Sequence, residues 1–262
     1  MVPEHVEKLW SASASLPGWF RKEAAHLLGL LDYAHQREGI RGDLFEIGVF
    51  HGKSTLLLAG MVDPEREKLG VCDSFKFRTA DCTPPREVFL ENFHNVFPSA
   101  DFLRVYAKRS QELTQDEIGT CRLIHIDGAH SLEAVTADLE LASDCIDPRG
   151  VIVLDDAFRG TWPGVTEAII RFLDTRSSFS PLIIGFGKMA LVPEGARGLY
   201  EPLFVSRDIY EQYWRPESVR LRTDSICGSS TFVIAEKKQS RHGLWGRIKN
   251  RKRAVADYLS LG

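Results

Sequence analysis

The alternation of apolar and polar positions divides the chain into a helical start, a long middle part with short apolar runs, and a basic end. Residues 1–41 place apolar side chains at helical spacing, interrupted by Pro17 and Gly18, and predict two or three helices. From residue 43 onward, short apolar runs are each followed by a turn of small residues and a helical pattern. Seven such runs occur, at residues 43–49, 69–75, 101–107, 121–128, 150–156, 181–187 and 230–236.

Strands that alternate with helices indicate βαβ units, and hence a mostly parallel sheet. We therefore predict an α/β, Rossmann-like fold with a seven-stranded, mostly parallel sheet and helices on both faces. Its parts are a helical cover (1–41), a main domain (42–236) and a C-terminal extension (237–262). Ligands of such sheets lie beyond the carboxyl ends of the strands, and we look for the chemistry there.

The composition is that of a soluble globular protein, with 44% hydrophobic and 26% charged residues in a chain of 262. The first residues lack the basic start and apolar run of an export signal, and no apolar run reaches the roughly 18 residues of a membrane span. The five cysteines lack C-x-x-C spacing, which argues against a disulfide framework and a structural zinc site. These features predict a cytoplasmic protein.

The charge is unevenly distributed. Residues 237–253 contain eight Lys and Arg and no acid, so with a net charge of −3 the rest of the chain carries −11. We expect this segment to be solvated or docked on its own domain. The alternative is a peripheral contact with the inner face of the membrane, and a nucleic-acid partner is the least favoured.

The stretch EIGVFHGKST (46–55) is similar to a phosphate-binding loop but differs from it in two ways. A Walker A loop has four residues between its glycines, whereas Gly48 and Gly52 enclose three. Glu46, at the end of the first strand, would repel a polyphosphate. A nucleotide-dependent phosphotransferase that uses residues 48–55 is therefore the second choice.

The same loop suits S-adenosylmethionine. Glu46 matches its ammonium group, and the helix N-terminus near Ser54 can hold its carboxylate through backbone N–H groups. Asp73, at the end of the second strand, is placed for the ribose hydroxyls.

Acids and a histidine follow the fourth and fifth strands. Asp127 and His130 come after the fourth strand, and Asp155 and Asp156 end the fifth. Three carboxylates at one sheet edge repel each other unless a cation neutralises them, and Mg²⁺ fits best. Structural roles are the alternatives: Asp127 as a helix cap, although Ser131 suits that role better, Asp156 as a partner of loop amides, and His130 as a helix-start residue.

Four blocks in this order resemble a known family. They are E-x-G-x-x-x-G-x-S with Asp73, IDGAHSLEAVTADLELA, GVIVLDDAF and WPGVTEAIIRFL. Over roughly residues 42–190 the chain resembles class I S-adenosylmethionine-dependent methyltransferases of the macrocin (sugar) O-methyltransferase type. The resemblance implies a homo-oligomer that methylates a hydroxyl of a sugar or glycosylated natural product.

The resemblance also implies a set of site residues. Cofactor contacts are expected at Glu46, Gly48, Gly52, Ser54, Asp73, Ser74 and Ser110. Mg²⁺ is expected on Asp127, Asp155 and Asp156, with Asp127 and His130 as catalytic residues and His130 as the general base. A sugar hydroxyl is a very weak acid, so a cation and a base that takes its proton would both favour attack on the methyl group. A phenolic or lipid-linked acceptor, or a non-catalytic binding protein of this fold, are the further alternatives.

Overall fold

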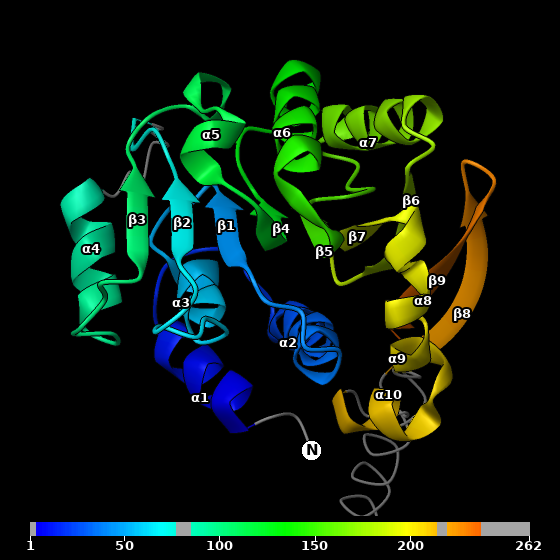
Figure 1. Ribbon diagram of the computed structural model, residues 1–262, viewed down its shortest axis with the longest axis horizontal. Coiled ribbons are helices and arrows are strands. Elements are labelled where there is room, and N and C mark those ends of the chain that lie inside the picture. The colour runs from blue at the N-terminus through cyan, green and yellow to red at the C-terminus, as the bar shows by residue number, and fades with distance from the viewer. Residues whose placement is uncertain (1–3, 77–84, 214–218, 237–262) are drawn as a thin grey trace, which may run out of the picture.

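The computed structural model describes residues 4–76, 85–213 and 219–236. These residues form a nine-stranded sheet in the order β3-β2-β1-β4-β5-β7-β6-β9-β8, with helices on both faces (Figure 1). The strands are β1 (Asp43–Ile47), β2 (Leu69–Cys72), β3 (Leu103–Tyr106), β4 (Cys121–Ile126), β5 (Ile146–Asp155), β6 (Phe179–Gly185), β7 (Lys188–Pro193), β8 (Val219–Ile226) and β9 (Ser229–Glu236).

The predicted Rossmann-like fold is confirmed, with two strands more than expected. Strands β1 to β5 pair in parallel, and all seven predicted runs form strands. The additional strands are β7, which pairs antiparallel with β5 and β6, and β8, which pairs antiparallel with β9. Strand β8 is mostly polar and lies at the sheet edge, so it lacks the continuous apolar run of a central parallel strand.

The helices connect the strands and flank them. They are α1 (Glu4–Ser13), α2 (Lys22–Arg37), α3 (Lys53–Ala59), α4 (Arg86–His94), α5 (Gln115–Ile118), α6 (Leu132–Cys145), α7 (Pro163–Thr175), α8 (Arg197–Tyr200), α9 (Pro202–Val205) and α10 (Arg207–Tyr213). Two 3-10 turns add η1 (Ser110–Glu112) and η2 (Glu194–Ala196). Ser131 caps α6 by accepting a hydrogen bond from the Ala134 N–H at 3.2 Å, as its sequence position indicated.

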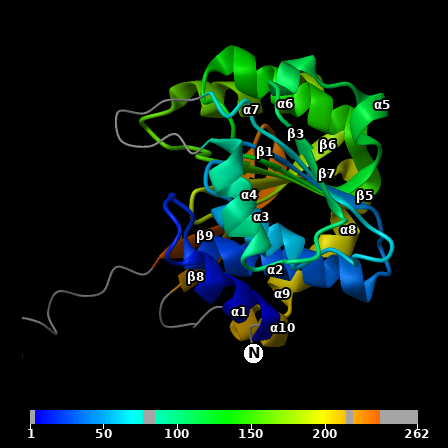
Figure 2. The same ribbon diagram turned by 90° about the vertical axis from the view of Figure 1, so that its left-hand side faces the viewer.

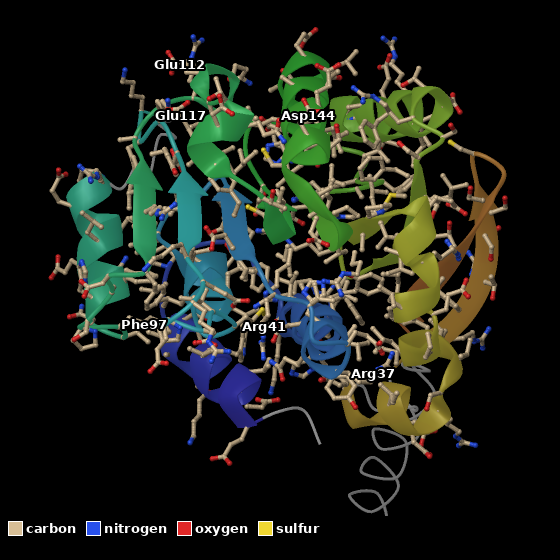
Figure 3. The ribbon with its side chains drawn as sticks, viewed as in Figure 1. Arg37, Arg41, Phe97, Glu112, Glu117 and Asp144 are labelled. Atoms are coloured by element: carbon tan, nitrogen blue, oxygen red, sulfur yellow. The ribbon has the colours of Figure 1, made fainter. Side chains whose placement is uncertain are left out.

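Alternating residues of the central strands pack into two apolar clusters, one on each face of the sheet. Val151 and Val153 of β5 lie in the cluster that contains α2 and α3, and Ile152 and Leu154 lie in the cluster that contains α6 and α7. Figures 1 and 2 show α5, α6 and α7 together on one side and α1, α2 and α3 on the other. Figure 3 shows acidic Glu112, Glu117 and Asp144 on the first side, and Arg37 and Arg41 on the second.

Helix α2 is part of this core. Leu27, Leu28, Leu30 and Leu31 are fully buried in the same cluster as Leu44 of β1.

Within the described ranges, no helix combines the length and the apolar character needed to cross a membrane. The basic segment 237–253, with its predicted membrane contact, lies outside the described residues.

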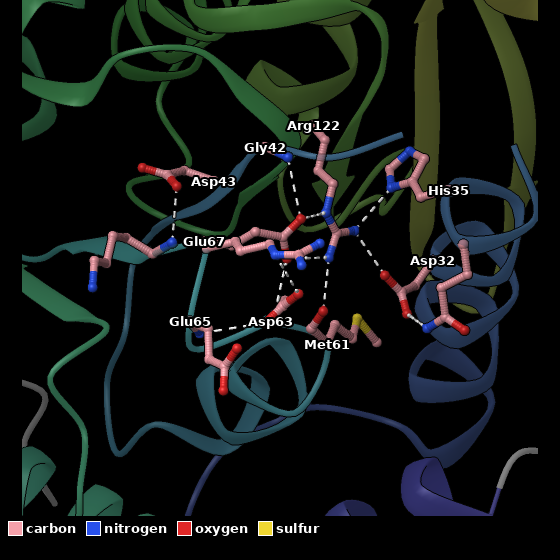
Figure 4. A network of polar contacts seen from close by, with 12 residues as sticks. Asp32, His35, Gly42, Asp43, Met61, Asp63, Glu65, Glu67 and Arg122 are labelled. Carbon is pink, nitrogen blue, oxygen red and sulfur yellow. Dashed lines mark hydrogen bonds and ion pairs between the residues drawn. The ribbon is translucent and has the colours of Figure 1, made fainter. Parts of the chain in front are cut away.

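A buried ionic network ties α2 to the start of β4 (Figure 4). Arg122 donates to Asp32 at 2.7 Å, to the two Glu67 oxygens at 3.0 and 3.2 Å, and to the Met61 carbonyl at 2.7 Å. Burial raises the pKa of Glu67, but the hydrogen bonds from Arg122 and from the Asp63 and Gly42 N–H groups, together with the Arg122 charge, outweigh it, so that the pKa lies below its ordinary value of 4.5. The charges of this network are therefore matched in the folded chain.

His35 extends the network toward α8. Its Nδ1 accepts from Arg122 at 3.0 Å, and its Nε2 donates to the Tyr200 hydroxyl at 2.6 Å, which in turn donates to the Arg149 carbonyl at 2.6 Å. Burial and the Arg122 charge lower the pKa of His35 to about 3. His35 is therefore neutral and serves as a hydrogen-bond link between the helices and β4.

Replacing Arg122 with Met is expected to lower the free energy of unfolding by about 3–5 kcal/mol, because Asp32 and Glu67 would keep buried charges without a partner. Urea unfolding followed by circular dichroism measures the change. The triple variant R122M/D32N/E67Q removes those charges and should recover most of the loss. Arg222→Met, which breaks an exposed pair with Asp224, is the control and should leave stability unchanged. A tolerated R122M would contradict the assignment.

Candidate active site

The loop after β1 is tightly enclosed between the ends of the neighbouring strands. Gly48 and Gly52 both have φ of +87°, and the Gly48 N–H donates to the Cys72 carbonyl at 2.9 Å. A Cβ atom on Gly48 would lie 2.0 Å from the Asp127 carbonyl oxygen, and one on Gly52 would lie 3.0 Å from the Phe89 ring. Glycine is therefore required at position 48 for both its backbone angle and its space.

Asp73 holds residues 48–52, which we call the glycine loop, in place. One carboxylate oxygen accepts from the N–H groups of Val49 and Phe50 at 2.9 and 3.2 Å, and the other accepts from the Phe75 N–H at 2.8 Å. The sequence placed Asp73 against the ribose of the cofactor. A carboxylate has about four lone-pair sites, so a ribose contact is compatible with these bonds and stays a prediction.

Glu46 is fully buried, and both of its oxygens have partners. One accepts from the Thr55 hydroxyl of α3, and the other lies 2.9 Å from Nδ1 of His125 on β4. Glu46 and His125 are register partners in the parallel pair β1–β4, which brings them together. The predicted contact between Glu46 and a cofactor ammonium stays a prediction, and that ammonium would have to compete with His125 or Thr55.

Lys53 does not point toward the glycine loop. Its Nζ lies 3.5, 3.2 and 3.5 Å from the carbonyl oxygens of Ala14, Leu16 and Gly18, and 5.5 Å from the centre of the Trp10 ring. Next to it, the Trp19 ring stacks on Phe50 at 5.7 Å. A phosphate-binding loop needs this lysine at the phosphates. In this arrangement the phosphotransferase alternative lacks that cation.

The three predicted serines lie at the same edge of the sheet but in different surroundings. Ser54 is buried in the first turn of α3. Ser74 follows Asp73, and its hydroxyl accepts from the Lys76 N–H at 3.3 Å. Ser110 begins η1 and hydrogen-bonds to Asp138, whose pKa burial raises to about 6 in spite of that bond. Their cofactor contacts stay predictions.

The acids after β4 and β5 converge, as the sequence predicted. We call Asp127, Asp155 and Asp156 the acid edge. Asp127 and Asp155 hydrogen-bond to each other, and Nε2 of His130 lies 3.1 Å from Asp156 Oδ2 and 3.9 Å from Asp127 Oδ1. Nε2 of His130 has no hydrogen-bond partner among the described residues, so the 3.1 Å contact with Asp156 is electrostatic.

Neighbouring residues fix His130 and Asp156. The Trp162 ring stacks on His130 at 4.6 Å with an interplanar angle of 16°. Arg159 donates to the second Asp156 oxygen at 2.7 Å, and Asp156 itself has a left-handed backbone with φ of +55°. Phe158 and Trp162 are 46% and 41% exposed, so they offer aromatic surface beside the histidine.

The sequence did not predict the role of Lys188, the first residue of β7. It is 1% exposed, and its Nζ lies 2.6 Å from Asp155 Oδ2 and 3.2 Å from His125 Nε2. The signal for it in the sequence is a lysine that opens an apolar run directly after a Phe-Gly turn. Since the strand β7 was not predicted, this lysine could not be placed beside the acid edge.

The charges of the acid edge shift its pKa values in opposite directions. Burial and the negative charge of Asp155 raise the pKa of Asp127 well above 3.8. Burial also acts against the charge of Asp155, but the Lys188 ammonium outweighs it and lowers that pKa. Burial and the Lys188 charge lower the pKa of His125. We therefore assign one negative charge to the Asp127–Asp155 pair, opposite Lys188.

The acid edge in this arrangement does not fit the predicted Mg²⁺. Among the residues described, no three His, Cys, Asp or Glu side chains are grouped so that they could hold a metal ion. Lys188 pairs with Asp155, Arg159 pairs with Asp156, and Asp127 is bonded to Asp155. Mg²⁺ prefers ionised carboxylates and water in an octahedron, which these pairs oppose. We assign no step of the reaction to a metal ion.

Comparisons with known proteins agree with the fold. Residues 45–157 match the family model described as "Methyltransferase domain". A search of curated proteins found no significant match. This matched segment contains the glycine loop, Asp73, His130 and the acid edge.

Solved structures of methyltransferases have a fold similar to that of this chain. The O-methyltransferase NovP superposes with a TM-score of 0.57 at 16% identity, over 71% of this chain and 88% of that chain. CalS11, a TDP-rhamnose 3′-O-methyltransferase of calicheamicin biosynthesis, gives 0.52 at 15%, over 73% and 94%. S-adenosylhomocysteine-bound PaMTH1 from Podospora anserina gives 0.52 at 14%, over 74% and 89%. This chain therefore has the Rossmann-like fold of class I methyltransferases, and its residues 45–157 are similar to a methyltransferase domain.

Proposed function

We propose that this chain is an S-adenosylmethionine-dependent O-methyltransferase that acts on a hydroxyl of a sugar or glycosylated natural product. The observation that carries the proposal is the close approach of Gly48 to the backbone of Asp127. It is so close that a Cβ atom on residue 48 would lie 2.0 Å from the Asp127 carbonyl oxygen. This approach brings the start of the glycine loop directly beside the end of β4, the strand that leads to His130. A donor on the loop and an acceptor at the histidine would therefore be neighbours.

The chain's own groups account for donor binding. When bound, S-adenosylmethionine supplies an electrophilic methyl group. The glycine loop would follow its methionine part, and Asp73 and Ser74 would face its ribose. Glu46, Ser54 and Ser110 complete the proposed set. Asp73 already holds the loop amides of Val49 and Phe50, so the loop is shaped before the cofactor arrives.

His130 is placed to take the proton of the acceptor hydroxyl. Stacking on Trp162 fixes the plane of its ring, and Asp156 lies 3.1 Å from Nε2, where it would stabilise the positive charge that forms. Removal of the proton makes the oxygen a stronger nucleophile. Holding the two reactants in line would supply much of the remaining acceleration.

A sugar acceptor is supported by the surroundings of His130 and by the neighbours in fold. The exposed faces of Trp162 and Phe158 lie beside the histidine and suit the apolar face of a sugar ring. CalS11, which shares the fold, is described as acting on TDP-rhamnose. Phenolic and lipid-linked acceptors are the alternatives. The predicted homo-oligomer and cytoplasmic location stay predictions.

Isothermal titration tests the donor. We expect micromolar binding of S-adenosylhomocysteine and no binding of ATP with Mg²⁺. Asp73→Asn should weaken S-adenosylhomocysteine binding at least tenfold, because an amide cannot accept from the loop amides and the ribose with both oxygens. Asp101→Asn, an exposed site, is the matched control. ATP binding without S-adenosylhomocysteine binding would favour the phosphotransferase. If the protein binds neither ligand, the result would favour a non-catalytic protein.

Methyl transfer from labelled S-adenosylmethionine to a panel of acceptors tests the substrate class. The panel compares nucleotide sugars and glycosides with catechols and simple phenols. We expect turnover with at least one sugar hydroxyl. Turnover with phenols alone would overturn the sugar assignment and leave the O-methyltransferase assignment in place.

A further inference from the structure

The fold places a buried lysine at the acid edge. The turn between β6 and β7 has left-handed φ angles of 56° and 82° at Phe186 and Gly187, and it brings Lys188 into register with Asp155 of β5. The ammonium of Lys188 lies 2.6 Å from Asp155, 3.2 Å from His125 and 4.8 Å from the centre of the Phe20 ring. A buried ammonium needs such partners because it is cut off from water.

Lys188 also joins the acid edge to the residues under the glycine loop. The Nδ1–H of His125 donates to Glu46, so its Nε2 accepts from Lys188. Glu46 in turn accepts from Thr55 of α3. The chain of contacts runs from the helix after the glycine loop, through Lys188, to Asp155 and Asp127.

These contacts leave the acid edge neutralised from within the chain. Asp155 forms an ion pair with Lys188, and Asp156 forms one with Arg159. Asp127 is hydrogen-bonded to Asp155. A divalent ion at this edge would meet the Lys188 ammonium at short range, and it would have to displace both lysine and arginine from their carboxylates. The edge is arranged for a fixed cation of the protein.

We propose that Lys188 supplies the positive charge that a divalent metal ion would otherwise bring to the acid edge, and acts as a positioning residue that holds Asp155 and Asp127 beside His130. The proposal rests on the methyltransferase function proposed above. It implies that transfer proceeds after chelation of metals, and that removal of the lysine creates a metal site from the same carboxylates.

Titration of the full chain with Mn²⁺, followed by electron paramagnetic resonance, tests the proposal without a turnover assay. Wild-type protein should bind no Mn²⁺ at up to about 1 mM, a concentration at which weak carboxylate sites begin to fill. Lys188→Met should gain a Mn²⁺ site with at least tenfold tighter binding than wild type. The double variant K188M/D155N, which lacks both charges of the pair, should lose that site again.

Turnover provides the second readout. Wild-type turnover should change less than twofold in EDTA, whereas K188M should lose at least tenfold in EDTA and regain activity with Mg²⁺. A lysine with only a structural role would give no such metal rescue. If K188M fails to fold, K188M/D155N keeps the test open, because it leaves no unpaired charge and should bind S-adenosylhomocysteine without binding Mn²⁺.

The results that overturn the proposal are distinct from those that overturn the proposed function. Loss of wild-type turnover in EDTA with return in Mg²⁺ would overturn it, as would a wild-type Mn²⁺ site that Asp156→Asn removes. A folded K188M that binds S-adenosylhomocysteine but gains no Mn²⁺ affinity would also do so. Absence of S-adenosylhomocysteine binding by wild-type protein would instead contradict the methyltransferase function.

Discussion

Replacing His130 with Gln is expected to lower kcat for methyl transfer by about 10²–10⁴-fold, the usual contribution of a general base. Glutamine keeps a polar side chain of similar size beside Asp156 and Trp162 but takes no proton from the acceptor. Binding of S-adenosylhomocysteine should change less than threefold, because the proposed function assigns His130 to the acceptor and not to the donor. Steady-state kinetics and isothermal titration measure the two effects.

His94→Gln, on the exposed face of α4, is the matched control and should keep kcat within twofold. The pH profile separates a base from a structural residue. The rise of kcat/KM with pH that a general base produces should be present in wild type and absent from H130Q. An H130Q variant that keeps more than a tenth of the activity would contradict the assignment of the base.

Replacing Gly48 with Ala is expected to destabilise the chain by more than about 3 kcal/mol and to abolish S-adenosylhomocysteine binding. The added Cβ would lie 2.0 Å from the Asp127 carbonyl oxygen, and the φ of +87° disfavours alanine in any case. The three atoms nearest to this Cβ position all belong to the backbone of Asp127 and Gly128, so no side-chain rotation relieves the clash. The loop therefore has to leave its place, and Asp73 would lose its contacts with Val49 and Phe50.

Gly39→Ala separates the two causes. Gly39 has φ of +63° with no atom within 4 Å of its Cβ position, so its alanine variant should lose only about 1–2 kcal/mol, the cost of a left-handed backbone. Chemical unfolding of both variants gives the comparison. A G48A variant as stable as G39A and still able to bind S-adenosylhomocysteine would mean that the loop does not need its close contact with Asp127.

The parallel half of the fold was predictable because its central strands β1, β2 and β4 are buried on both faces. Runs such as VIVLD and RLIHI read as continuous apolar stretches with helical patterns between them. Strand β8 could not be predicted in this way, because it is an edge strand that is mostly exposed and polar, with Arg220, Arg222 and the polar run 222–225. Strand β7 follows β6 after a two-residue turn, so the pair resembled one strand and a loop.

The site was predictable where chemistry follows from strand order, and not where it depends on pairing across the sheet. Asp127, Asp155 and Asp156 meet because their strands are parallel neighbours. The partner of Asp155 comes from an antiparallel strand more than thirty residues later, so the sequence indicated a metal ion where the fold supplies Lys188. Likewise, the residues next to Arg122 in the sequence give no sign of its ion pairs with Asp32 and Glu67, which lie 90 and 55 residues before it in the chain.

The three carbonyl groups that surround Lys53 have a consequence for how the N-terminal segment and the donor depend on each other. Lys53 directly follows Gly52, and it binds Ala14, Leu16 and Gly18, while Trp19 rests on Phe50 inside the loop. Any rearrangement of the loop is thus passed to the chain before α2. Thermodynamic reciprocity then requires that whatever factor a bound donor adds to the ordering of residues 14–19, their ordering adds the same factor to donor affinity.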